Sequence, residues 1–283
     1  MSLVLKSNVA YKGSLSDLPI IGDMYQVTNA VTMVGTRLLN GNYKGALLKV
    51  RRKVDNAEKD IGYTANGGLD TASLMSFIGS GDGAVAVMYD QSGNGNNIRR
   101  AYAEGQPEIV IAGVLQVDDK GQACLRYRLP DKAMFLANPP STVQSYMGAY
   151  IEGKFDVYGF AVINPDDASK TRFALKAENG VTKLHYRNSL TDTLRVMEFD
   201  ASMVSESQKY FASIDSVKGE AVIKDKMQTK TQKLVNYEKL TRIREVIVGN
   251  SQPSADTGSM IGYMTAFVYV DTPTDGEALK DTI

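Results

Sequence analysis

The sequence predicts an all-β fold: an antiparallel sandwich with a short helix and an N-terminal arm. Short apolar runs rich in β-branched and aromatic residues recur along the chain, and turn-forming residues separate them. Helical patterns are confined to short segments. With 283 residues, the chain can bury a sizeable core without help from disulfides or metals.

The candidate strands follow one another at intervals of roughly 10 to 20 residues, a spacing typical of sandwiches and barrels. Turn sequences such as Asn164-Pro165 and Glu178-Asn-Gly lie between them. The strands are expected at residues 27–39, 44–52, 84–89, 108–117, 123–128, 156–163, 171–177, 183–187, 194–199, 210–215, 220–224, 245–249 and 262–270.

A helix is predicted over residues 69–78. Asp70 can cap its first turn, and Leu74 and Ile78 fall on one face. Glycines at positions 79, 81 and 83 end it. The tail at residues 273–281 has the pattern of a short terminal helix.

The domain organisation predicted is an N-terminal arm, residues 1–26, followed by one sandwich, residues 27–283, with a possible subdivision near 130–150. The arm mixes polar and apolar residues, and Gly13, Pro19 and Gly22 interrupt it. It has no apolar core of the signal-peptide kind, and no stretch of the chain reaches the length of a membrane span. We therefore expect synthesis and folding in a reducing cytoplasm.

The charge balance and the single cysteine and histidine limit which partners and which chemistry the chain can have. Lys plus Arg equals Asp plus Glu at 32 each, so nothing favours nucleic acid or an anionic membrane as partner, and self-association is tolerated. Cys124 is the only cysteine, so no internal disulfide can form, and its strand-like surroundings indicate a small buried residue. His185, the only histidine, lies in another strand-like run, where we expect a structural histidine. No cofactor is expected.

Residues 37–97 contain four ordered blocks: Arg37-Leu with a later Tyr-x-Gly, Val50-Arg-Arg with Asp-Asn-Ala-Glu-Lys-Asp, Leu69-Asp-Thr-Ala, and Tyr89-Asp-Gln-Ser-Gly-Asn-Gly-Asn-Asn. This stretch resembles the N-terminal part of the α-L-arabinofuranosidase B catalytic domain, and is similar to domains of bacteriophage virion proteins. The resemblance implies a concanavalin-like, or laminin-G-like, antiparallel β-sandwich.

The chain departs from the enzyme pattern in its pocket residues. The arabinofuranosidases carry a vicinal cysteine pair and a tryptophan before the Tyr-Asp-Gln block, whereas this chain has one cysteine, Met88 at that position, and no tryptophan. Retaining glycosidases also need two carboxylates about 5 to 5.5 Å apart. No recognisable block supplies them, so no catalytic residue is assigned.

The motif residues are expected to support the fold. Arg51 and Arg52 with Asp55, Glu58 and Asp60 could bind a ligand, but we expect an ion-pair network that joins a strand to the next loop.

The loop that begins at Asp90 allows two interpretations. Asp90, Ser92 and Asn94 alternate as in the first half of a calcium loop, but Ala101 stands where the bidentate glutamate belongs. We expect instead a structural turn in which Asp90, Gln91 and Asn94 bond local backbone groups.

Three functions follow as hypotheses; we expect the first, and the other two are alternatives. The first is a non-enzymatic virion protein, a decoration, collar or tail-associated module, that assembles in the host cytoplasm with other virion subunits or as a homo-oligomer. The second is a lectin-like carbohydrate-binding module with a glycan as partner. The third is an α-L-arabinofuranosidase-like glycosidase.

Overall fold

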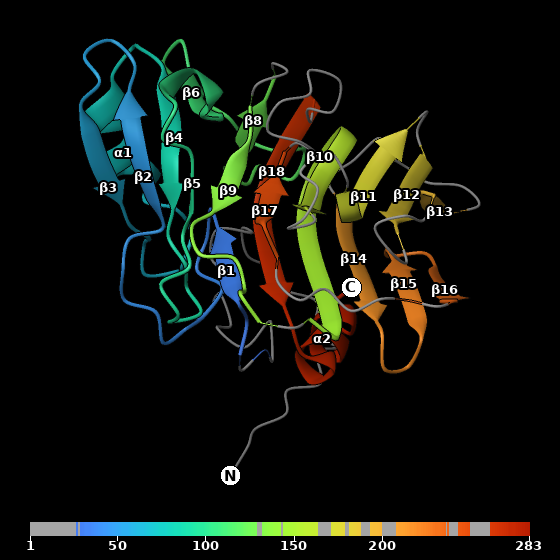
Figure 1. The fold of residues 1–283 in the computed structure, drawn as a ribbon. Helices are drawn as coiled ribbons and strands as arrows, with labels where there is room; N and C mark the ends of the chain where they lie inside the picture. Colours follow the sequence, from blue (N-terminus) through green and yellow to red (C-terminus); the bar gives the residue numbers. More distant parts are fainter. Residues whose placement is uncertain are drawn as a thin grey trace.

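The computed structural model describes residues 27, 29–128, 132–142, 144–163, 171–178, 181–187, 193–199, 208–235, 237, 243–249 and 261–283. The predicted arm, residues 1–26, lies outside the described residues. Two α-helices are present among the described residues, and all cross-strand pairs are antiparallel (Figure 1). The all-β sandwich prediction is confirmed. Within the same residues, no helix is long and apolar enough to span a membrane.

One run of paired strands begins at β3 and ends at β13. In spatial order its members are β3 (Glu58–Ile61), β2 (Leu48–Arg52), β4 (Gly83–Met88), β5 (Ile98–Arg99), β9 (Met134–Leu136), β17 (Glu245–Val248), β10 (Tyr146–Ile163), β11 (Thr171–Glu178), β12 (Val181–Tyr186) and β13 (Arg195–Glu198).

A second run shares β10 with the first and continues to β18, whose far edge pairs with both β1 and β8. β8 in turn pairs with β6, which pairs with β7 and β4. The new members are β16 (Thr229–Lys233), β15 (Glu220–Lys224), β14 (Gln208–Asp215), β18 (Ile261–Val270), β1 (Thr32–Gly35), β8 (Leu125–Tyr127), β6 (Glu108–Ile111) and β7 (Val114–Leu115).

Strand β10 connects the two runs. Its first half pairs with β14 and β18, and its second half pairs with β11 and β17. In Figure 1 it runs beside β18. A single strand of 18 residues therefore belongs to both sheets.

The main core lies between the two sheets. Phe160 of β10 packs on Phe267 of β18, with ring centroids 5.7 Å apart, and Phe155 meets Tyr210 of β14 edge-on at 5.2 Å. Residues on these strands alternate between this core and the opposite face, as the two-residue period of a strand requires.

A second apolar cluster lies on the outer face of β10, β14 and β18. Tyr150, Phe211 and Val268 belong to it, and α2 (Pro273–Lys280) covers it through Leu279. Figure 1 shows α2 at the lower end of β10. Gly276 permits the close approach of α2, because a Cβ atom there would collide with the ring and hydroxyl of Tyr146.

Both predicted helices are present. α1 (Thr71–Ile78) lies within the range predicted from the sequence, and the Asp70 carboxylate accepts a hydrogen bond from the Ser73 N–H at 3.0 Å. This bond to the backbone lowers the pKa of Asp70. A short 3-10 helix, η2 (Ala103–Gly105), was not predicted.

Candidate functional site

The motif loop after β4 closes on a buried carboxylate. Asp90 Oδ1 accepts hydrogen bonds from the N–H groups of Met33 and Ser92, both at 2.9 Å. Its Oδ2 accepts from the Ser92 hydroxyl at 2.7 Å and from the Asn96 N–H at 2.9 Å. Four donors thus satisfy Asp90, and one of them belongs to β1.

Other side chains of the same loop hold the segment around β1. Gln91 Oε1 accepts from the Leu39 N–H at 2.6 Å, and Gln91 Nε2 donates to the Arg37 carbonyl at 3.0 Å. Asn94 Nδ2 donates to the Ala30 carbonyl at 2.7 Å. The loop therefore fastens both ends of β1 to the sandwich.

The calcium interpretation would need several of these groups to point elsewhere. Both carboxylate oxygens of Asp90 face N–H or O–H donors. The Ser92 hydroxyl donates to Asp90 and accepts from the Asn94 N–H, and Asn94 Nδ2 donates to the Ala30 carbonyl, so these groups are engaged with the protein itself. In the part of the chain that the structure describes, no three His, Cys, Asp or Glu side chains are grouped closely enough to hold a metal ion. The hydrogen bonds are those of a structural turn.

The expected ion-pair network is wrong for Arg51. Its guanidinium donates to three neutral oxygens: Gln106 Oε1 at 2.8 Å, Asn56 Oδ1 at 2.8 Å and the Ala103 carbonyl at 3.0 Å. Arg51 is buried, and neutral oxygens around it satisfy its planar donors. Sequence spacing could not predict this, because Gln106 and Ala103 lie some fifty positions away in the chain.

The rest of that block forms separate surface contacts. Arg52 pairs with Asp55 at 2.6 Å, and this hydrogen bond helps to lower the pKa of Asp55 to about 2. Glu58 lies 3.8 Å from Lys49. Asp60 accepts from the Tyr89 hydroxyl at 2.8 Å. These contacts join β2 to β3 and to the turn between them, and β3 to the residue after β4, so they form separate pairs and no single network.

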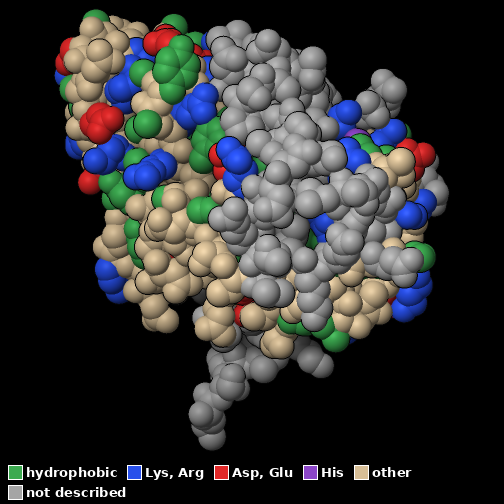
Figure 2. Space-filling view, in the orientation of Figure 1, with side chains coloured by type: hydrophobic (Ala, Val, Ile, Leu, Met, Phe, Trp, Pro, Cys, Tyr) green, Lys and Arg blue, Asp and Glu red, His purple; other side chains and the backbone are tan. Residues whose placement is uncertain are grey.

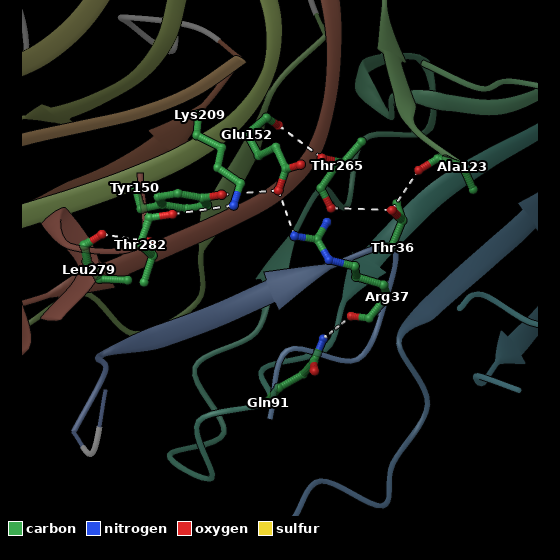
Figure 3. A network of polar contacts seen from close by, with 10 residues as sticks. All are labelled: Thr36, Arg37, Gln91, Ala123, Tyr150, Glu152, Lys209, Thr265, Leu279 and Thr282. Atoms are coloured by element: carbon green, nitrogen blue, oxygen red, sulfur yellow. Dashed lines mark hydrogen bonds and ion pairs between the residues drawn. The ribbon is translucent and has the colours of Figure 1, made fainter. Parts of the chain in front are cut away.

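A buried charged group lies on the outer face of β10 (Figure 3). Arg37 Nη2 donates to Glu152 Oε2 at 2.6 Å, and the side chains are only 11% and 6% exposed. The Tyr150 hydroxyl donates to the same oxygen at 3.1 Å. Lys209 of β14 faces Glu152 in the strand register and donates to the Thr282 carbonyl at 3.4 Å.

Burial and the neighbouring charges shift the pKa values of Glu152 and Lys209. Burial disfavours the Glu152 carboxylate, but the charge and hydrogen bond of Arg37, together with Lys209 and Tyr150, hold its pKa below the usual range. Burial lowers the pKa of Lys209, and the charges of Arg37 and Lys120 lower it further, against the opposing effect of Glu152. Glu152 is therefore an ionised acceptor at neutral pH.

An ionised Glu152 cannot donate a proton as a general acid, and a nucleophile would need a protonated partner about 5 to 5.5 Å away. Asp271 is the one described carboxyl whose pKa is raised, by burial and by the charge of Asp275. Ala266 of β18 pairs with Glu152 of β10, and Asp271 lies five positions beyond Ala266 in the chain. That offset is about 16 Å of strand, so the two carboxyls form no dyad.

Cys124 and His185 have the expected positions. Cys124 is buried as a free thiol, and burial raises its pKa to about 12. His185 is buried in β12 opposite Ala174 of β11.

Comparison with known proteins shows which family this chain resembles. The sequence profile described as "Alpha-L-arabinofuranosidase B, catalytic" matches residues 22–124. The chain is similar to the arabinofuranosidase B catalytic domain. Probable α-L-arabinofuranosidase B of Aspergillus flavus is 39% identical over 71 residues, 25% of this chain and 14% of that protein. α-L-Arabinofuranosidase B of Aspergillus oryzae is 37% identical over a stretch of the same length.

Solved structures extend the similarity of fold to most of the chain. An arabinofuranosidase in complex with arabinofuranosyl-α-1,2-xylobiose superposes with a TM-score of 0.59 at 15% identity. A GH54 α-L-arabinofuranosidase soaked with a cyclic sulfate inhibitor superposes with 0.62 at 16% identity. Each match covers 92% of this chain and 64% of the other, so the chain spans less than two thirds of those enzymes.

Proposed function

We propose that this chain is a carbohydrate-binding protein built on an arabinofuranosidase-type sandwich, and that its ligands are glycans that carry α-L-arabinofuranosyl groups. The observation that carries the proposal is the coincidence of two matches. Residues 22–124 match the family profile, and 92% of the chain shares the fold of an enzyme whose structure holds an arabinofuranosyl-xylobiose.

The matched motif residues support binding without implying hydrolysis. Asp90 and Gln91 fasten β1, Arg51 holds a neighbouring loop, and Asp70 caps α1. Residues with these partners preserve a scaffold whether or not the protein cleaves its ligand. Similarity in residues 22–124 is therefore compatible with a family fold used for recognition.

The acid groups and the pocket residues favour binding over cleavage. Among the described residues, Glu152 is paired with Arg37, and Asp271 is too distant to complete a catalytic pair with it. The single cysteine and the absence of tryptophan remove two features of the enzyme pattern. Tyrosines, of which the chain has 15, remain as platforms for sugar rings.

Two assays on the full chain test the proposal. Isothermal titration with arabinofuranosyl-substituted xylo-oligosaccharides should give saturable binding, and the unsubstituted xylo-oligosaccharides serve as the control. Incubation with 4-nitrophenyl α-L-arabinofuranoside should release no nitrophenol above background. Equal affinity for both oligosaccharide sets would reject the ligand class. Turnover that one Asp or Glu substitution abolishes would replace binding by hydrolysis.

The virion hypothesis stays a prediction. It concerns assembly, so it can hold for a glycan-binding protein as well. Deletion of residues 1–26 should leave a folded sandwich that no longer joins its particle or oligomer. An unchanged assembly state after the deletion, measured by sedimentation, would contradict it.

A further inference from the structure

Three buried polar side chains hold residues 100–106, here called the Tyr102 loop, and two of them come from other parts of the chain. Arg51 comes from β2, Lys132 precedes β9, and Gln106 ends the loop. Their exposed fractions are 7%, 3% and 2%. Buried polar groups are costly unless they are satisfied, so their partners show what they stabilise.

All three bond the main chain of the Tyr102 loop. Arg51 donates to the Ala103 carbonyl at 3.0 Å and to Gln106 Oε1 at 2.8 Å. Gln106 Nε2 donates to the Arg100 carbonyl at 3.0 Å. Lys132 Nζ donates to the Gln106 carbonyl at 2.7 Å. The loop is thus held at its start, its middle and its end.

The side chain of Arg100 is held as well. Its guanidinium lies 4.9 Å from the ring centroid of Phe135 and 5.7 Å from that of Tyr102. The absence of a side chain at Gly105 leaves room for it, because a Cβ atom there would collide with Arg100 Nε. Arg100 therefore connects the Tyr102 ring to the sheet at β9.

The ring that these contacts hold in place is exposed to solvent. Tyr102 is 58% exposed, and within the described part of the chain it is the one aromatic among the large exposed apolar side chains. Figure 2 shows apolar, basic and acidic side chains side by side over the end of the molecule that β4 and β6 form. A flat apolar ring with donors beside it has the chemistry of a sugar platform.

We propose that the Tyr102 loop is a preorganised glycan subsite in which a sugar ring stacks on Tyr102 and its hydroxyls accept hydrogen bonds from Arg100. The proposal rests on the proposed function and gives it a location. Rigidity lowers the entropy lost on binding, and the buried contacts of Arg51, Gln106 and Lys132 supply that rigidity. Arg51 of the family motif would then serve recognition through the loop it positions.

The test is a titration of the full chain with arabinofuranosyl-substituted xylo-oligosaccharides, followed by calorimetry. Tyr102→Ala should weaken binding about tenfold, because the stacking surface is lost. Tyr102→Phe should bind as the wild type does, because the platform is the ring and not the hydroxyl. Val54→Ala, at a side chain that is 82% exposed outside the loop, is the matched control and should change nothing.

Two further variants test the position of the Arg100 guanidinium and leave the Tyr102 ring unchanged. Gly105→Ala should displace the Arg100 guanidinium and weaken binding severalfold, with the unfolding midpoint nearly unchanged. Arg100→Lys should weaken binding to a similar degree, since lysine lacks the planar donor group that stacks on both rings.

The outcomes separate this inference from the proposed function. If the wild type binds arabinofuranosyl ligands and Tyr102→Ala binds equally well, the subsite is rejected while the proposed function stands. If binding is Tyr102-dependent but only pyranosides bind, the subsite stands and the arabinofuranosyl ligand class is rejected. If no glycan binds and Tyr102→Ala instead abolishes self-association, both proposals fail.

Discussion

Arg37 and Glu152 form a buried ion pair at 2.6 Å that ties the segment after β1 to the middle of β10. Figure 3 shows it between the Gln91 contact to Arg37 on one side and Tyr150 and Lys209 on the other. The pair therefore connects the motif loop, through Gln91, to the strand shared by both sheets.

Removal of one partner should be far more costly than removal of both. Glu152→Leu leaves the Arg37 guanidinium buried without its counter-charge, so the free energy of unfolding should fall by about 3 to 5 kcal/mol. The double variant Arg37→Met/Glu152→Leu should lose markedly less. Urea denaturation at neutral pH measures both. Equal losses in the single and double variants would show that the charge itself contributes little.

The same pair makes stability depend on acid pH. The pKa of folded Glu152 is lower than the ordinary value of 4.5, so its contribution is complete above that value. It is lost as the pH falls below about 4.5 towards the lower folded pKa, because the unfolded state then takes up the proton first. The unfolding free energy of the wild type should fall more steeply over this range than that of Glu152→Gln. Parallel curves for the two proteins would contradict the assignment.

The Asp90 loop should be structural. Asp90→Ala leaves backbone N–H groups at Met33, Ser92 and Asn96 without their acceptor, and should lower the free energy of unfolding by roughly 1 to 3 kcal/mol. Asp90→Asn, which keeps one oxygen acceptor, should lose less. The measurement is thermal unfolding with and without calcium. A large calcium-dependent rise in the midpoint that a chelator reverses would favour the cation loop.

Local sequence patterns predict the local structure of this chain well. The cap at Asp70 and the turn at Asp90 use residues within a few positions, so spacing alone indicates them. Most strands were located for the same reason, because alternation is a local property. The expected ranges leave out β3, β5, β9, β16 and the first half of β10. β5 and β9 have only two and three residues, β3 and β16 consist mostly of charged and polar residues, and Gly148 and Gly153 interrupt the pattern of β10.

Contacts between distant segments leave no pattern in the sequence. Glu152 lies in the half of β10 that the expected strands leave out, and Arg37 and Lys209 meet it from the segment after β1 and from β14. Gln106 and Lys132 stand in no motif at all, and their role depends on how β2, β6 and β9 are brought together.

Cys124 should be inert in the folded protein. It is fully buried, and burial raises its pKa to about 12, so almost no thiolate forms at neutral pH. An aromatic disulfide reagent should label it only in urea, where one thiol per chain should react. Rapid labelling of the native protein would mean that β8 and the turn before it open readily.

The close contact between α2 and Tyr146 should make Gly276 intolerant of a side chain. In Gly276→Ala the new Cβ collides with the Tyr146 ring, so the helix must move away from the outer face of β10. The free energy of unfolding should fall by about 1 to 3 kcal/mol, the usual cost of overpacking, despite the higher helix propensity of alanine.

The control is Gly62→Ala, because there is open space around Gly62. Gly219→Ala would be unsuitable, because Gly219 has a positive φ that strains any side chain. The double variant Gly276→Ala/Tyr146→Leu should lose less than the sum of the single losses, since the smaller side chain relieves the collision. Additive losses in urea denaturation would show that α2 does not rest on Tyr146 in solution.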